Sequence, residues 1–346
     1  MPTQVLSTFP SKKLEPWGGK FREIFLKSRQ VQIVTGYVSS DSLFALAELI
    51  KRHPSLEKIE LIVGMAGKDG LTANQKLQLS ELNLSLLIDN TGEIKVPISL
   101  PVHAKVAIFD QKEFILGSSN LSGLEIEASN IEVDIWGDEP AAVQNTQTIF
   151  NDLWAKSLNY QEAEAQISTI TVQEDFLSGF KEVQRVDKDV LEGLGELDLR
   201  FELPLKDGEK SRKSNLNASF AAPRKSGGSP RNWFEVEIIV PKPIRELPGF
   251  PSKREGNENF VVFTDDGYSF ECHMSGTGGK NFASTGDLTI LGRWIKGRLI
   301  NSGSIGYGEL YTADVAASYG RTSLSLIKLD LPDTWLLSYE QPERLK

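Results

Sequence analysis

A histidine, a lysine, a serine and an asparagine lie between residues 103 and 120, at positions that a single β-hairpin would bring together. The run is His-Ala-Lys-Val-Ala-Ile-Phe-Asp-Gln-Lys-Glu-Phe-Ile-Leu-Gly-Ser-Ser-Asn. Two apolar segments flank the polar residues 110–113, which predicts two strands joined by a tight turn that begins at Asp110. Pairing of Phe109 with Phe114, or of Asp110 with Glu113, continues into the same register. That register sets Lys105 opposite Ser118 and His103 opposite Asn120.

Residues two apart on a strand share a face, so we expect the four polar side chains on one side of the hairpin and Val106, Ile108 and Ile115 on the side that faces the core. A neutral imidazole is a nucleophile or base near neutral pH, lysine adds a positive charge, and serine and asparagine add neutral hydrogen-bond donors. Together they suit a phosphodiester whose charge grows in the transition state. A histidine and a lysine two residues apart are common on solvated strands, so the whole spacing carries this prediction.

The spacing His-x-Lys, four residues, Asp, six residues, Gly-Ser-x-Asn resembles the HKD motif of the phospholipase D superfamily. Asn130-Ile131-Glu132 is similar to the Asn-x-Glu that follows the motif in nuclease members. The resemblance implies that His103 attacks phosphorus to form a phosphohistidine, that Lys105 and Asn120 hold the nonbridging oxygens, and that Ser118 supports them. It also implies that Glu132 holds the imidazole in its productive tautomer. Structural roles within the motif are expected for Asp110, which falls in the turn, and for Gly117 and Asn130.

The motif occurs once, whereas superfamily chemistry resembles a scheme with two histidines, one the nucleophile and one the acid. The chain has three histidines, and neither His53 nor His273 lies in a second motif. His53 stands at an expected helix end and His273 in an expected strand, so both are interpreted as structural or solvated. The resemblance therefore implies a homodimer with a shared active site on its two-fold axis.

The sequence shows no cluster of ligands with zinc spacing, and the single Cys272 cannot build such a site. Members with this motif act without a divalent metal, so we expect no cofactor in this chain. No Walker loop is present either, and the Gly-rich segment 64–70 is interpreted as a strand-to-helix turn beside the active cleft.

Length and composition describe an ordinary globular protein with more than one domain. The chain has 346 residues, of which 40% are hydrophobic and 25% charged, and its net charge is −9. The single cysteine, the absence of a signal-like N-terminus and the absence of a long apolar run predict a cytoplasmic protein with no membrane partner.

Residues 1–165 alternate between strand and helix patterns, which predicts an α/β sandwich with a mixed sheet, in agreement with the phospholipase D fold. The expected strands are 31–38, 59–63, 84–88, the motif hairpin and 131–136, and the expected helices are 42–52, 72–82 and 141–157. Residues 166–205 are strongly acidic and are interpreted as a partly helical linker.

Residues 206–346 are expected to form a DNA-recognition domain, because a basic run opens them. Lysine and arginine supply phosphate contacts, and asparagine can reach base edges, although a flexible solvated linker would have the same composition. The expected DNA-binding residues are Arg212, Lys213, Asn215, Asn217, Arg224, Lys225 and Arg231, with Lys280 and Asn281 in a second arm.

The strand candidates after residue 230 predict an all-β open pseudobarrel. They are 233–240, 259–263, 268–274, 323–329 and 334–339, with helices at 288–299 and 312–318. The runs 290–299 and 319–337 resemble the plant-B-three-like domain behind the nuclease in restriction endonucleases of the NgoFVII and BfiI type.

The resemblance implies a sequence-specific, type II-like restriction endonuclease that hydrolyses double-stranded DNA without metal. In the NgoFVII-like branch cleavage is coupled to a separate helicase-type ATPase, so any use of ATP would require that partner subunit. Two alternatives are a nonspecific phosphodiesterase or phospholipase of the same superfamily and a DNA-binding regulator with an inactive nuclease domain. The first does not explain the basic arm, and the second would have lost residues that are present here.

Overall fold

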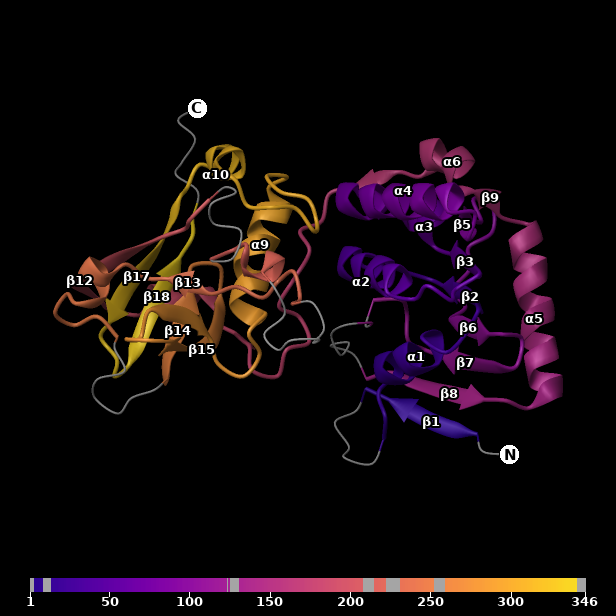
Figure 1. Ribbon diagram of the computed structural model, residues 1–346, viewed down its shortest axis with the longest axis horizontal. Helices are drawn as coiled ribbons and strands as arrows, with labels where there is room; N and C mark the ends of the chain where they lie inside the picture. Colours follow the sequence, from indigo (N-terminus) through magenta and orange to yellow (C-terminus); the bar gives the residue numbers. More distant parts are fainter. Residues whose placement is uncertain are drawn as a thin grey trace. The chain divides into compact units, whose positions relative to one another are not determined.

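The chain forms two compact units, Met1–Val172 and Gln173–Lys346 (Figure 1). The computed structural model describes residues 3–8, 14–122, 124, 131–207, 215–221, 231–251 and 259–340. Within these ranges no helix is long and apolar enough to cross a membrane.

The N-terminal unit is built on one mixed eight-stranded sheet. Its strand order is β1 (Gln4–Ser7), β8 (Val133–Gly137), β7 (Glu113–Gly117), β6 (Val106–Phe109), β2 (Gln30–Thr35), β3 (Lys58–Val63), β5 (Gly92–Val96) and β9 (Leu158–Asn159). The neighbours β2, β3 and β5 are parallel, whereas β1, β8, β7, β6 and β2 pair antiparallel in succession. The parallel strands are connected by helices, as parallel pairs require.

Helices cover both faces of this sheet. One face carries α1 (Trp17–Phe25), α2 (Ser40–Lys51) and α4 (Ala73–Ile88), and the other carries α5 (Pro140–Ala155), as Figure 1 shows. The short helices α3 (Ala66–Asp69), α6 (Tyr160–Ala163) and η1 (Glu164–Gln166) lie in the connections, and β4 (Leu71–Thr72) pairs with β10 (Thr169–Ile170). Both faces of the central strands β6, β2 and β3 are therefore largely buried, and most of their residues are apolar.

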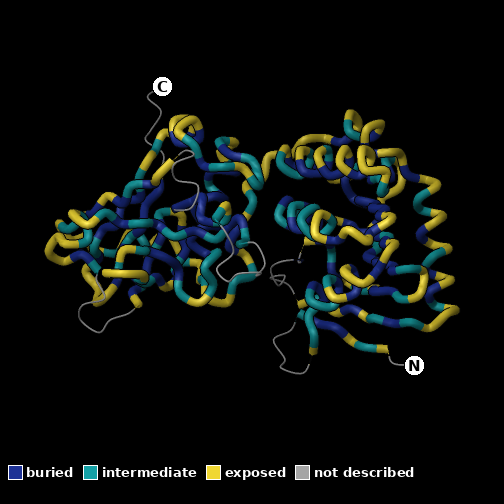
Figure 2. The backbone as a smooth tube through the Cα atoms, in the orientation of Figure 1, coloured by how far each residue is buried: buried dark blue, intermediate teal, exposed yellow. Residues whose placement is uncertain are grey.

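Two apolar clusters follow from the alternation of side chains along the strands. The larger lies under α1, α2 and α4 and includes Phe109 and Ile115. The smaller lies under α5 and includes Val106, Ile108 and Phe150. Figure 2 shows the buried residues concentrated along the strands. Val106 and Ile108 do face the core, but Ile115 lies on the other side, so its expected placement beside them is wrong.

Most expected elements of this unit are confirmed, but residues 84–88 belong to α4 and not to a strand. Helix α4 is longer than expected because its buried face continues through Leu79, Leu82 and Leu86, at helical spacing. Thr72 begins the helix with a capping box completed by Gln75. The strand that was expected at 84–88 lies further along the chain, as β5, which begins at Gly92 after the helix.

The C-terminal unit is a strand-rich curved sheet with one long buried helix. The strand order is β12 (Glu196–Pro204), β17 (Ser323–Leu329), β18 (Thr334–Ser338), β14 (Asn259–Thr264), β15 (Tyr268–Ser275), β16 (Asn281–Ser284) and β13 (Ile238–Ile239), and β11 (Gln184–Arg185) pairs with β15. The long helix is α9 (Ile290–Asn301), and the shorter ones are α7 (Lys188–Glu192), η3 (Ala218–Phe220), α8 (Lys242–Arg245) and α10 (Ala313–Tyr319). The expected fold class, an α/β sandwich followed by an all-β open pseudobarrel, is confirmed.

Two expectations about this unit need correction. Residues 166–205 do not form a linker, because Ile167 is buried in the N-terminal core and β12 pairs with β17 over most of its length. Of the acidic residues that suggested a linker, Glu196, Asp198 and Glu202 lie on β12, the last strand of its sheet, where they are exposed. In the expected strand 233–240 only Ile238 and Ile239 are in a strand, because the preceding backbone packs against α9 at Gly292.

A glycine at the end of β3 provides a test of this packing. A Cβ at Gly64 would overlap the carbonyl of Val102 in the neighbouring chain segment. We expect Gly64→Ala to lower the free energy of unfolding by about 1–3 kcal/mol, the usual result of overpacking. Gly19→Ala, in α1 with its nearest atoms at 3.9 Å, should raise it by about 0.5–1 kcal/mol. Urea denaturation of both variants measures this, and equal stability of the two would contradict the packing argument.

Candidate active site

The motif hairpin has a register one residue away from the expected one. Phe109 pairs with Glu113 and Val106 with Leu116, so the expected pairing of Phe109 with Phe114 is wrong. The reason lies in the turn, where Asp110 and Gln111 have φ values of 50° and 55° and the Lys112 amide donates to the Phe109 carbonyl at 2.9 Å. Three residues thus separate the paired positions, where the expected turn had two or four.

Asp110 lies in this turn, as expected, and its carboxylate ties the turn to the start of β2. One carboxylate oxygen accepts the backbone N–H groups of Arg29 and Gln30, both at 2.8 Å. The Asp110 amide in turn donates to the Gln30 carbonyl at 2.9 Å. These bonds fix the far end of the hairpin, away from the histidine.

The motif residues gather at one edge of the sheet in spite of the register shift. Each of β2, β6, β7 and β8 is antiparallel to the next, so the ends of β2 and β7 lie beside the starts of β6 and β8. His103 and Lys105 precede β6, residues 118–120 follow β7, and Glu132 precedes β8. The topology therefore places all of them in one neighbourhood.

Lys105 folds back onto His103. Its ammonium group lies 2.7 Å from the His103 carbonyl oxygen and 3.0 Å from each imidazole nitrogen. The side chain is buried, and desolvation lowers the pKa of Lys105, while the charge of Glu132 opposes that shift. A buried cation beside an imidazole is well placed to attract a phosphate group.

The side chains of Asn120 and His103 both lie next to Gly36. A Cβ at Gly36 would lie 3.0 Å from the His103 ring and 3.1 Å from Asn120 Oδ1, so both side chains use the space that glycine leaves. Asn120 Oδ1 accepts the backbone N–H of Tyr37 at 3.0 Å. This bond fixes which end of the amide is the oxygen, and it turns the NH2 donor away from Tyr37.

Glu132 lies beside Ser118. The Ser118 hydroxyl donates to the Glu132 carboxylate, and the Val133 amide donates to Ser118 Oγ at 3.0 Å. Within the part of the chain that the structure describes, Glu132 thus bonds Ser118 and not the imidazole, which corrects the expected contact with His103. Gly117 ends β7, and Asn130 lies outside the described residues.

Tyr37 and Asp69 also belong to this neighbourhood, although the sequence pattern did not single them out. The Tyr37 ring packs edge-on against His103, with ring centroids 5.6 Å apart, and its hydroxyl donates to Asp69 at 2.6 Å. That bond raises the pKa of Tyr37. Asp69 lies in the Gly-rich segment 64–70, which was expected to border the cleft. The available signal was the Gly-Tyr pair directly after a buried strand.

The other two histidines have structural partners. His53 is buried, and its Nε2 lies 2.6 Å from the Ser28 carbonyl oxygen. His273 Nδ1 lies 3.2 Å from the Thr285 hydroxyl in the C-terminal unit. His103 is therefore the histidine of the candidate site.

A cavity of about 670 Å³ lies at the turn end of the hairpin, opposite the candidate site. It is lined by residues of the turn, the end of β8 and α5, among them Lys112, Trp136 and Gln147. The motif residues are not in its lining. The reactive groups instead lie at the opposite ends of the same strands.

The expected DNA-binding residues differ in burial, and four of them lie outside the described residues. Arg212, Lys213, Arg224 and Lys225 lie outside the described residues. Asn215 and Asn217 are fully buried, and their amides bond backbone groups of other segments, Pro204 and Ile239 for the first and Tyr311 for the second. The expectation that these two contact bases is wrong, because they hold the domain's own backbone together.

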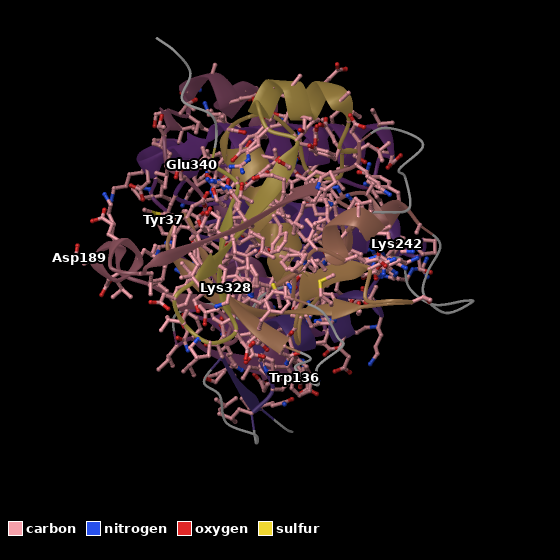
Figure 3. All side chains as sticks on the ribbon, turned by 90° about the vertical axis from the view of Figure 1, so that its left-hand side faces the viewer. Tyr37, Trp136, Asp189, Lys242, Lys328 and Glu340 are labelled. Carbon is pink, nitrogen blue, oxygen red and sulfur yellow. The ribbon has the colours of Figure 1, made fainter. Side chains whose placement is uncertain are left out.

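The other expected DNA-binding residues are exposed or partly buried; they are Arg231, Lys280 and Asn281. Arg231 pairs with Glu235 at 3.4 Å and Glu237 at 3.9 Å, which offsets its charge. Lys280 is exposed, and Asn281 is partly buried in β16. The Arg245 guanidinium of α8 donates to Gly278 in the expected second arm, and Figure 3 shows Lys242 of the same helix projecting outward. Basic side chains therefore lie in the expected second arm and beside it.

Two family models match the chain. Residues 20–167 match the NgoFVII restriction endonuclease N-terminal PLD domain, and residues 193–330 match the NgoFVII C-terminal B3-like DNA-binding domain. Together they cover most of the chain, one in each unit. No curated protein sequence matches it.

Solved structures resemble part of the chain. A phospholipase D family member, Nuc from Salmonella typhimurium, is 16% identical with a TM-score of 0.36, over 46% of this chain and 97% of that one. NucT from Helicobacter pylori is 13% identical with a TM-score of 0.32, over 46% and 98%. TrmBL2, an archaeal chromatin protein, is 14% identical with a TM-score of 0.31, over 45% and 53%. Each similarity covers less than half of this chain.

The lowered pKa of Lys105 predicts how its replacement affects stability. Below the lowered pKa both folded and unfolded chains carry the proton, and the folded chain bears the full desolvation cost; wild-type stability then rises as the pH approaches the ordinary value of 10.5. Lys105→Met should therefore be more stable than wild type near neutral pH, by a margin that shrinks in alkali. Denaturant unfolding across pH measures this. Lys112→Met, on the exposed turn, should change stability by less than about 0.5 kcal/mol, and a destabilised Lys105→Met would contradict the argument.

Proposed function

The chain belongs to the NgoFVII restriction endonuclease family, with the nuclease-type domain first and the DNA-binding domain second, and we propose that it is a sequence-specific, type II-like restriction endonuclease. The observation that best supports this proposal is the convergence of His103, Lys105 and Asn120 at one edge of the sheet. A nucleophile, a cation and a neutral donor together suit the attack on a phosphodiester.

In the proposed reaction an imidazole nitrogen of His103 attacks phosphorus, and the P–O bond to the leaving DNA end breaks, which forms a phosphohistidine. Lys105 and Asn120 stabilise the nonbridging oxygens, and Ser118, held by Glu132, supports them. A general acid gives the leaving oxygen its proton. Water then hydrolyses the P–N bond, which releases the second DNA end with its phosphate and restores the imidazole.

We propose that the reaction needs no divalent metal. A metal ion in a phosphoryl-transfer site neutralises charge on the nonbridging oxygens and orients the phosphate. Lys105 and Asn120 would supply the same charge stabilisation and orientation from the protein. Coupling to a separate helicase-type ATPase, which the family resemblance implies, stays a prediction.

The site needs a second histidine for the general acid, and we propose that a second copy of the chain supplies it. The outer face of β7, β8 and β1 presents an apolar stripe, formed by half-exposed Leu116, Val133, Ile135 and Val5. Leu116 and Val5 each pair with Ile135, so the stripe is continuous across three strands, and it begins two residues from Ser118. A copy seated on this stripe would lie beside the candidate site, as a two-fold interface requires.

The C-terminal unit would choose the DNA site. Its family model is a DNA-binding domain, and the basic run that begins at Lys206 would supply phosphate contacts. Lys242, Arg245 and Lys280 gather where the second arm was expected. We propose that these groups contact the DNA backbone of a double-stranded site, while residues outside the described ranges reach the bases.

Cleavage of plasmid DNA in the presence of EDTA tests the reaction. Wild-type protein should give discrete fragments and an acid-labile phosphoprotein adduct, and His103→Ala should lower the cleavage rate by about 10³-fold or more, because the nucleophile is lost. His273→Gln is the matched control and should cleave normally. Cleavage by wild type only with added metal would contradict the metal-free mechanism, and a smear of fragments would contradict site specificity.

Sedimentation equilibrium tests the shared site. Wild-type protein should sediment as a dimer, and Ile135→Glu should dissociate it and reduce cleavage, because a charge at the centre of the stripe would be buried without a partner. Ile149→Glu, at an exposed isoleucine of α5 that is not part of the stripe, should leave the dimer intact. An active wild-type monomer would rule out the shared active site.

A further inference from the structure

A buried carboxylate in β8, Asp134, lies directly behind the candidate site without a role in the reaction described above. Its side chain is 1% exposed. One oxygen accepts the backbone N–H of Ser119 at 3.0 Å, and the other accepts the Ser119 hydroxyl. Burial raises the pKa of Asp134, and the bonds from Ser119 oppose that shift. A carboxylate buried at this depth destabilises the fold unless its bonds compensate.

The partner of Asp134 is the residue between the two functional side chains of the loop after β7. Ser118 and Asn120 flank Ser119, so two bonds from Asp134 restrain the backbone from which both side chains project. Leu121, which follows Asn120, is bonded to the end of β2, because its amide donates to Thr35 Oγ1 at 2.9 Å. The Thr35 hydroxyl donates to the Tyr37 carbonyl at 2.7 Å, and the Tyr37 amide holds Asn120.

Gly117 gives Asp134 the room to reach Ser119. A Cβ at Gly117 would overlap the Asp134 side chain and the backbone of β8. The φ of Gly117 is not in the left-handed region, so close approach and not backbone conformation requires glycine here. The glycine of the Gly-Ser-x-Asn spacing thus has a physical reason in this chain, and that reason is Asp134.

Asp134 and Lys105 both line a small void of about 10 Å³, together with Thr35, Gly117 and Ser119. That volume is about the size of one water molecule. The buried carboxylate and the buried ammonium thus border the same space, and Lys105 also bonds the His103 carbonyl.

We propose that Asp134 and Ser119 form a positioning pair that sets the place of Asn120 and Ser118 against the scissile phosphate. Glu132, directly before β8, and Asp134 in β8 then hold two consecutive serines, and each acts on the site through its serine. The pair rests on the proposed function for its effect on catalysis, but not for its effect on the conformation of Asn120. A displacement of the donor by a fraction of an ångström would lower kcat and leave DNA binding, which the other unit dominates, nearly unchanged.

Three variants test the pair in the full-length protein. Asp134→Ala should lower kcat for DNA cleavage by about 10–100-fold, the usual effect of losing a group that orients a reacting one, with KM changed by less than about threefold. Asp134→Asn should restore most of kcat, because its amide oxygen can accept the Ser119 amide and its NH2 can donate to the Ser119 hydroxyl. Ser119→Ala should have an intermediate effect, because it keeps the backbone bond and removes the side-chain bond.

Two controls keep the outcome decisive. The side-chain amide of Asn120 is observed directly by ¹H–¹⁵N NMR, and its resonances should shift in Asp134→Ala and Ser119→Ala but stay near the wild-type positions in Asp134→Asn. Thermal unfolding shows whether each variant folds, and Ser119→Ala replaces Asp134→Ala if the latter does not. Unchanged Asn120 resonances, or equal loss of kcat in Asp134→Asn and Asp134→Ala, would overturn the proposal. If the wild-type protein shows no nuclease activity but the Asn120 resonances still shift in Asp134→Ala and Ser119→Ala, the positioning pair is retained and the proposed function is rejected.

Discussion

The antiparallel pairing of β2, β6, β7 and β8 is the constraint on which the candidate active site depends. Each reversal of chain direction returns the next strand end to the same edge of the sheet. Residues from four separate chain segments are thereby held by hydrogen-bonded strands, of which β2 and β6 are largely buried on both faces. A reactive group on such a frame keeps its place, because moving it would require a shift in the packed core.

Close backbone approach at two glycines also determines where the side chains of the candidate site lie. Gly36 leaves the space in which His103 and Asn120 meet, and Gly117 leaves the space through which Asp134 reaches Ser119. Neither glycine has a left-handed φ, so sterics and not conformational freedom explains both. Lys105 and Asp134 are buried, and for that reason each needs a partner: Lys105 bonds the His103 carbonyl and Asp134 bonds Ser119.

The two units divide the physical tasks. The N-terminal unit holds few reactive groups in a rigid sheet, whereas the C-terminal unit uses its polar residues largely to hold its own irregular segments together, as Asn215 and Asn217 do. Asparagines in a basic run resembled base-reading groups, because hydrogen-bonding capacity looks the same in the sequence whether it serves the backbone or a ligand. Burial decides between the two uses, and burial depends on segments far away along the chain.

The sequence by itself determined the motif, its resemblance, the fold class and most helices and strands, because hydrophobic periodicity and residue spacing are local properties. It identified His103, Lys105, Ser118, Asn120 and Glu132 as a group. Only the tertiary structure decided the hairpin register, since the turn's left-handed residues could not be inferred from composition, and only it showed that 84–88 continues a helix. It also brought Tyr37, Asp69 and Asp134 to the site. Apart from the Gly-Tyr pair after β2 and the Gly-rich segment that holds Asp69, the sequence gives little signal for them, because they reach the motif through strand pairing between distant segments, and such contacts exist only once the sheet has formed.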